Sequence, residues 1–324
     1  MDSIMNSSFV ARNESRICDY LPFTVNMVSY VATRGTLSTT VLSCVFNGLT
    51  LPFTLIANIL VFVAVLRKLE LRTVHNTSIL FLAATDLLVA SIAQPAFVVY
   101  QGSKLQESSF SCEALAVYTS TVFICTGLSI LTLIFITLER YFAIFYPFKY
   151  QHLVTTERTV FLIVVVWILW VIFISLVRFT PGTTTSTLSI IASILILTSI
   201  LITVFVYYKV QKLVIRNRRT ISASTSGVSE TSGEDSRRRR SIPETKTSRT
   251  AAWLTGSLVL CLLPTLITSS VFQAKVTNNV TLYHVIYPLT DTAILLNSTL
   301  NPFIYVFRSE SIRRSIREIF RRSA

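Results

Sequence analysis

Long runs of apolar residues, separated by short polar segments, dominate the chain. Seven runs are long enough to cross a bilayer as helices, which takes about 20 apolar residues each. They fall at about 43–66, 77–100, 113–139, 160–177, 188–208, 250–273 and 282–306. The pattern therefore predicts an all-α membrane protein, a bundle of seven transmembrane helices.

Two further patterns flank the last spans. From Arg308 to Phe320, isoleucines fall on one helical face and arginines on the other, which predicts a short amphipathic eighth helix along the inner leaflet. Residues 211–243 are polar, and we expect a disordered cytoplasmic loop there. In this loop, Arg238-Arg-Arg-Ser241 fits either a kinase substrate or a basic stripe near anionic headgroups. The predicted organisation is an outer tail over 1–42, a bundle over 43–306, and a cytoplasmic helix and tail over 307–324.

Composition and charge agree with this reading. The chain is 52% apolar and only 14% charged, whereas soluble domains carry about 25% charged residues. The net charge of +13 raises the possibility of nucleic-acid binding, but 23 of the 29 basic residues fall on one side of the predicted spans. The positive-inside rule then puts the amino terminus outside and the carboxyl terminus inside. The basic excess faces lipid headgroups and cytoplasmic partners, and nucleic acid is not an expected partner.

The outer segments carry candidate sites for modification. Asn6, Asn13 and Asn279 begin glycosylation sequons on segments placed outside. The second outer connection, about 179–187, lacks cysteine, so Cys112 is a candidate to pair with Cys18. Spacing alone does not settle connectivity, and a bridge to Cys44 or free thiols are the alternatives.

Several short motifs recur in order along the spans. They are Asn58, Leu82-Ala-Ala-Thr-Asp86, Glu139-Arg140-Tyr141, Trp167, Cys261-Leu-Leu-Pro264 and Asn297-Ser-Thr-Leu-Asn301-Pro302-Phe-Ile-Tyr305. Together they resemble the rhodopsin-like (class A) G-protein-coupled receptors. The resemblance implies a plasma-membrane receptor, not an enzyme, that passes an extracellular ligand signal to a heterotrimeric G protein. It also implies arrestins and kinases as partners, and no cofactor other than a bound sodium ion.

Asp86 lies near the middle of its span. A charge at that depth costs about 2.5–3.5 kcal/mol even on lenient insertion scales, so it needs a reason to be there. The resemblance implies that it meets four other oxygen-bearing side chains in a hydrated pocket that binds sodium, and oxygen ligands suit a hard cation. The four are Ser129, Asn297, Ser298 and Asn301. The alternative is a hydrogen-bonded cluster that joins helices without an ion.

The cytoplasmic ends carry the residues that the resemblance assigns to coupling. They are Glu139, Arg140, Tyr141, Phe148, Glu244 and Tyr305. Arg140 is expected to pair with Glu139 and with Glu244. The alternative for Glu244 is a solvated charge without such a pair. Phe148 resembles the residue that enters a hydrophobic pocket of the G protein, and its alternative role is membrane contact.

The resemblance does not assign the ligand. The second cytoplasmic loop resembles adrenergic and melanocortin receptors and weakly favours a stimulatory, cAMP-raising G protein. Val122 stands at the position where receptors for amines resemble one another in having an aspartate. An amine ligand bound through an aspartate at that position is therefore not expected. Leu258 and Leu262 replace the family's span 6 phenylalanine and tryptophan. A ligand-independent, constitutively active receptor-like protein is therefore an alternative, and a seven-span transporter a more distant one.

Helical spacing predicts a ligand pocket around Asp291. Residues seven apart lie on one helical face, so a Ser298 that faces the interior places Asp291, Tyr287 and His284 above it. The same count upward from Ser129 gives the facing residues Thr119, Val122, Phe123 and Thr126. This mainly apolar pocket with one carboxylate suits a small cationic molecule or a peptide. The alternative is a hydrated carboxylate, or one bonded to Thr290 or Tyr287.

Overall fold

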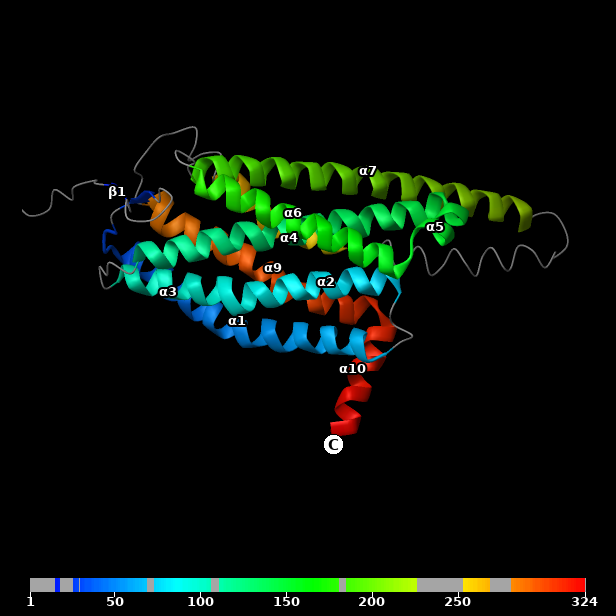
Figure 1. Ribbon diagram of the computed structural model, residues 1–324, viewed down its shortest axis with the longest axis horizontal. Coiled ribbons are helices and arrows are strands. Elements are labelled where there is room, and N and C mark those ends of the chain that lie inside the picture. The colour runs from blue at the N-terminus through cyan, green and yellow to red at the C-terminus, as the bar shows by residue number, and fades with distance from the viewer. Residues whose placement is uncertain are drawn as a thin grey trace, which may run out of the picture.

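The computed structural model describes residues 15–17, 26–28, 30–68, 73–105, 111–180, 185–225, 253–268 and 281–323. Within these ranges the chain is a bundle of long, roughly parallel helices (Figure 1). Its elements are β1 (Ser15–Ile17), β2 (Asn26–Val28), α1 (Arg34–Arg67), α2 (Val74–Leu88), η2 (Val89–Ala93), α3 (Gln94–Lys104), α4 (Ser111–Phe145), α5 (Pro147–Leu153), α6 (Thr156–Phe179), α7 (Thr185–Thr225), η3 (Leu282–Ile286), α9 (Tyr287–Arg308) and α10 (Glu310–Ser323). A further apolar helix spans Trp253–Thr268.

Helices occupy all seven predicted positions. In the described part of the chain, five helical segments are long and apolar enough to cross a membrane. The sixth, Trp253–Thr268, is a shorter apolar helix, because the residues on either side of it lie outside the described ranges. The seventh, η3 with α9, carries Asp291, Asn297 and Asn301, which lower its hydropathy.

The structure describes the first part of the loop for which disorder was predicted, from residue 211, as helix. The α7 helix continues to Thr225, well beyond the predicted end of its span at 208. The polar residues after 208 include Lys, Gln and Arg, which are good helix formers and extend an existing helix at low cost. Residues 226–250 lie outside the described residues.

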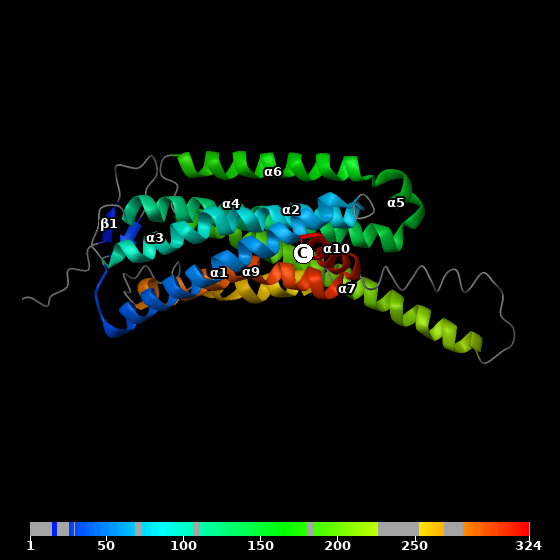
Figure 2. The same cartoon turned by 90° about the horizontal axis from the view of Figure 1, so that it is seen from below.

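The bundle is organised around α4. This helix packs against α7, α3, α2 and α6, while α6 lies along one outer face (Figure 2). A central hydrophobic cluster draws residues from several spans, including Leu82, Ile130, Leu254 and Tyr305. The strands β1 and β2 pair in antiparallel fashion near the end of the bundle where α1 begins, and α5 lies at the opposite end (Figure 1).

The side-chain pattern of α1 is inverted relative to a soluble helix. Its buried face consists mainly of threonine, serine and asparagine, whereas large apolar residues such as Leu49 and Phe53 are exposed. The polar groups bond across to α9: Thr54 meets Thr299 at 2.6 Å, and Asn58 donates to the Ser298 carbonyl at 3.1 Å. Such an arrangement is stable when hydrocarbon surrounds the helix, because polar contacts and close packing then hold the spans together.

Two irregularities shape the spans near their outer halves. The π-helical turn η2 ends two residues before Pro95, whose ring nitrogen has no hydrogen to continue the helical pattern. The second π-helical turn, η3, opens the seventh span. Because a π turn holds more residues than an α turn, it changes the helical phase of His284 relative to Asp291.

Two contacts between neighbouring elements fix local geometry. Gly127 of α4 lies directly against the indole of Trp170, which donates to the Ile124 carbonyl at 3.2 Å, so an added Cβ there would overlap the ring. After the seventh span, α10 is the predicted eighth helix. Ser315 donates to the Ala64 carbonyl at 3.2 Å, and Lys68 pairs with Glu318 at 2.6 Å.

Candidate functional site

A buried carboxylate lies at the centre of the bundle. Asp86 is 0% exposed, and the side-chain amide of Asn301 donates to its two oxygens at 3.3 and 3.0 Å. Ser298 lies beside the same carboxylate. Ser129 is also buried, but its hydroxyl bonds that of Thr85 at 2.9 Å. The structure thus brings together residues from α2, α4 and α9 that are far apart in the sequence.

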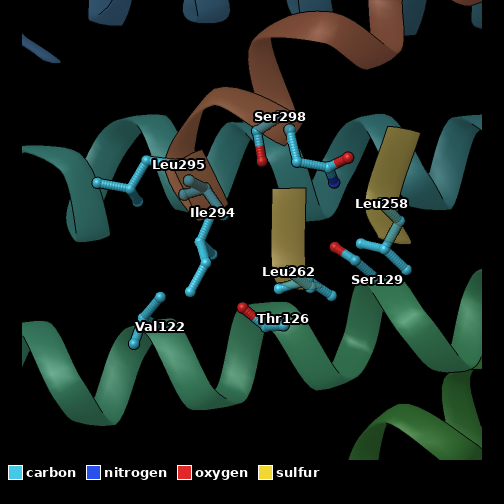
Figure 3. A pocket seen from close by; sticks show the side chains of 10 residues that line it. Val122, Thr126, Ser129, Leu258, Leu262, Ile294, Leu295 and Ser298 are labelled. Atoms are coloured by element: carbon cyan, nitrogen blue, oxygen red, sulfur yellow. The ribbon is translucent and has the colours of Figure 1, made fainter. Parts of the chain in front are cut away.

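A small cavity opens beside this cluster. Val122, Thr126 and Ser129 of α4 face Ile294 and Ser298 of α9, with Leu262 between them (Figure 3). Asn297 also lines the cavity, and its buried Oδ1 has no hydrogen-bond partner among the described residues. The same is true of Oδ1 of Asn301. One carboxylate together with neutral oxygens that lack partners fits a hard monovalent cation.

The two leucines that replace aromatic residues belong to this site. Leu258 and Leu262 line the cavity from the helix Trp253–Thr268, and both are buried. A leucine side chain fills less volume than that of tryptophan or phenylalanine. The replacement therefore leaves space between the Asp86 cluster and the cavity residues Val122 and Thr126.

The predicted ligand residues separate into four environments. Val122 and Thr126 line the central cavity. Thr119 accepts a hydrogen bond from Arg178 at 3.0 Å. His284 is buried, with its ring 5.2 Å from that of Tyr30 and 5.1 Å from that of Tyr283. Phe123, Tyr287 and Asp291 are half-buried.

Asp291 has neighbours that the periodicity did not identify. The hydroxyl of Tyr118 is directed toward it, and Lys104 lies within electrostatic range. Lys104 follows the predicted second span, which ends at about residue 100. In the structure it is the last residue of α3 and only 3% exposed. One signal in the sequence pointed to this burial: Lys104 follows Tyr100 by four residues, which places both on one helical face.

At the end of the bundle where α5 lies, Glu139 is the centre of a hydrogen-bonded group. Arg140 pairs with it, and its Nε donates to one carboxylate oxygen at 2.6 Å. The hydroxyl of Tyr150, from α5, donates to the other oxygen. Burial and then the Glu139 charge raise the pKa of Tyr150 well above its usual range, so the hydroxyl keeps its proton and remains a donor.

The other predicted coupling residues differ in exposure. Phe148 is 83% exposed on α5. Tyr141 packs against Phe205 of α7, with ring centroids 6.4 Å apart. Tyr305 is fully buried in the central hydrophobic cluster and does not lie on the surface. Glu244 lies outside the described residues.

The cysteines are only partly described. Cys44, Cys125 and Cys261 are free thiols, and Cys112 is in a disulfide. Cys18 lies outside the described residues, so its pairing with Cys112 stays a prediction. The sequon residues Asn6, Asn13 and Asn279 also lie outside them.

Comparison with known proteins places these features in a family. A family model described as 7 transmembrane receptor (rhodopsin family) matches residues 57–305. A 5-hydroxytryptamine receptor of Bombyx mori is 36% identical over 120 residues, 37% of this chain and 26% of that receptor. A histamine H2 receptor of Rattus norvegicus is 39% identical over 115 residues, 35% of this chain and 31% of that receptor. An octopamine receptor of Bombyx mori is 38% identical over 114 residues, 35% of this chain and 23% of that receptor. The matches span less than a third of the length of these relatives.

Proposed function

The chain belongs to the rhodopsin family of seven-transmembrane receptors, and from this membership we propose that it passes an extracellular ligand signal across the plasma membrane to a heterotrimeric G protein. The family is one of membrane receptors and not of enzymes. The excess of basic residues on one side of the spans supports an extracellular amino terminus.

The observation that carries the coupling proposal is the exposure of Phe148. A phenylalanine that is 83% exposed on a cytoplasmic helix leaves almost its whole ring available to a partner. It lies two residues before Tyr150, which bonds Glu139 next to Arg140. A partner that covers Phe148 therefore contacts the same short helix that holds this charged group. The resemblance of the loop to adrenergic receptors favours a stimulatory heterotrimer.

For the ligand, we propose that Asp291 is the acidic group of the site. The relatives are named for 5-hydroxytryptamine, histamine and octopamine, which are all amines. This chain has Val122 at the position where amine receptors carry an aspartate. Asp291 of α9 is half-buried among tyrosines near the outer end of the bundle, whereas Glu113, in the first turn of α4, is exposed.

The Asp86 cluster is proposed to hold a sodium ion. The buried carboxylate and the carbonyl oxygens of Asn297 and Asn301 that lack partners support this assignment. Ser129 and Ser298 would supply further oxygen ligands. A bound cation would compensate the Asp86 charge and thereby favour the arrangement of spans in which these oxygens converge.

Nucleotide exchange tests the coupling proposal. Membranes containing the chain are mixed with rising concentrations of a purified stimulatory heterotrimer, and exchange is compared with that of mock membranes. Burying a phenylalanine contributes about 1.5–3 kcal/mol, so Phe148→Ala should raise the half-maximal heterotrimer concentration by about 10- to 150-fold. The matched control is Leu153→Ala, which removes an exposed side chain from the same helix and should leave the value unchanged.

Two results would contradict the proposal. Exchange no faster than in mock membranes, with both stimulatory and inhibitory heterotrimers, argues against coupling itself. Equal losses in Phe148→Ala and Leu153→Ala argue against Phe148 as the contact.

A further inference from the structure

A lysine is buried where the second span ends. Lys104 is 3% exposed; its ammonium donates to Oε1 of Gln101 at 3.0 Å and lies 4.1 Å from the ring centroid of Tyr100. A hydrogen bond and a cation–π contact stabilise an ammonium, but neither supplies a full negative charge. A buried charge without a counter-charge is strongly destabilising. Lys104 therefore needs an acid.

Asp291 is the carboxylate that meets this need. Among the described residues it is the acidic side chain that acts electrostatically on Lys104. A stacked pair of tyrosines connects the two positions: Tyr100 lies under Lys104, and its ring centroid is 6.5 Å from that of Tyr118. Tyr118 is in turn directed toward Asp291. Opposite charges from α3 and α9 thus lie on either side of an aromatic layer.

The two charges do not touch. Within the described ranges no ion pair joins Lys104 to Asp291, and the ammonium is directed to Gln101. One buried donor nearby, Nε2 of Gln101, has no hydrogen-bond partner among the described residues. The region therefore contains both charges and hydrogen-bonding capacity that the chain itself does not use.

We infer that Lys104 is the counterion of Asp291 and thereby determines which ligands the site accepts. The site takes a ligand group without net charge and rejects a simple monoamine. The inference rests on the proposed role of Asp291 in ligand binding. A monoamine that approaches Asp291 meets the Lys104 charge as well, and it brings a net positive charge into a region that is already neutral. A group with an acceptor for Lys104 and a donor for Asp291 leaves the region neutral and can also accept from Nε2 of Gln101.

A double-mutant cycle tests the charge pair. Thermal midpoints are measured for the purified protein, Lys104→Met, Asp291→Asn and the double variant. Lys104→Met leaves the half-buried Asp291 carboxylate without its counterion, so it should melt lower than the wild type. Asp291→Asn should lower the midpoint of the wild type but raise that of Lys104→Met. This change of sign is expected only of coupled charges.

The control cycle uses an exposed pair in direct contact. Lys68 and Glu318 lie 2.6 Å apart with partly exposed side chains, so Lys68→Met and Glu318→Gln should be nearly additive. If Lys104→Met and Asp291→Asn also lower the thermal midpoint additively, the inference is overturned. If Lys104→Met yields too little folded protein for a melting experiment, the yields of folded protein are compared instead. A yield that does not recover in the double variant would also overturn the inference.

Chemical rescue tests the specificity. The probe is n-butylammonium, which reproduces the side chain that Lys104→Ala removes. It should raise the thermal midpoint of Lys104→Ala but not that of the wild type or of Lys104→Ala/Asp291→Asn, and neutral 1-butanol should have no such effect. Equal stabilisation of the wild type and Lys104→Ala, or none of either, would overturn the inference. Neither measurement involves a G protein, so failure of the proposed coupling would be seen separately.

Discussion

Replacing Asp86 by asparagine tests the proposed sodium site. The substitution keeps the shape of the side chain but removes the single buried carboxylate around which the neutral oxygens gather. Binding to the folded state alone stabilises by RT ln(1 + [L]/Kd), which is about 1.4 kcal/mol when sodium is in tenfold excess over its Kd. Without a cation, the wild-type carboxylate is an uncompensated buried charge and is itself destabilising.

The measurement is the thermal midpoint of the purified protein in sodium chloride and in choline chloride at equal ionic strength. The wild type should melt higher in sodium, because choline is too large for the cavity. Asp86→Asn should give the same midpoint in both salts, and in choline it should melt higher than the wild type. Ser91→Ala, which alters an exposed serine on the same span, should keep the full sodium response. A wild type that melts identically in the two salts would refute the reasoning, and the cluster would then join the helices without an ion.

Three further predictions concern packing, the cytoplasmic group and the outer disulfide. Gly127→Leu should sharply reduce folded protein at the cell surface, because its side chain would overlap Trp170. The matched control Gly102→Leu should be tolerated, because an added Cβ there meets nothing within 4 Å. Equal surface staining of the two variants would contradict this packing. Tyr150→Phe removes a donor to Glu139 and should raise basal nucleotide exchange a few-fold. The control Tyr146→Phe alters an exposed tyrosine that takes no part in that bond and should leave basal exchange unchanged. Basal exchange at the wild-type level in Tyr150→Phe would show that the bond does not restrain Arg140. Peptide mapping of the non-reduced protein should recover Cys112 joined to Cys18, and a free Cys18 thiol would exclude that bridge.

Much of the architecture follows from the sequence alone. The seven spans and the eighth helix are local patterns, because a bilayer requires about 20 apolar residues from each helix independently of its neighbours. The motif residues around Asp86 were identified by family resemblance and not by periodicity. The structure adds how they meet, with Asn301 bonding Asp86 across 215 positions of sequence.

The sequence was least informative where the rotation and length of the helices decide the outcome. Lys104 has the sequence context of an outer-loop residue, yet α3 extends far enough to bury it. The contacts between Arg178 and Thr119 and between Tyr150 and Glu139 join elements whose relative position no local pattern specifies. The π-helical turn η3 likewise changes the phase on which the seven-residue count from Ser298 to His284 depended. Hydropathy determines which segments enter the membrane, but only the packing of one helix against another determines which polar groups of different spans meet, as when Asp86 of α2 accepts from Asn301 of α9.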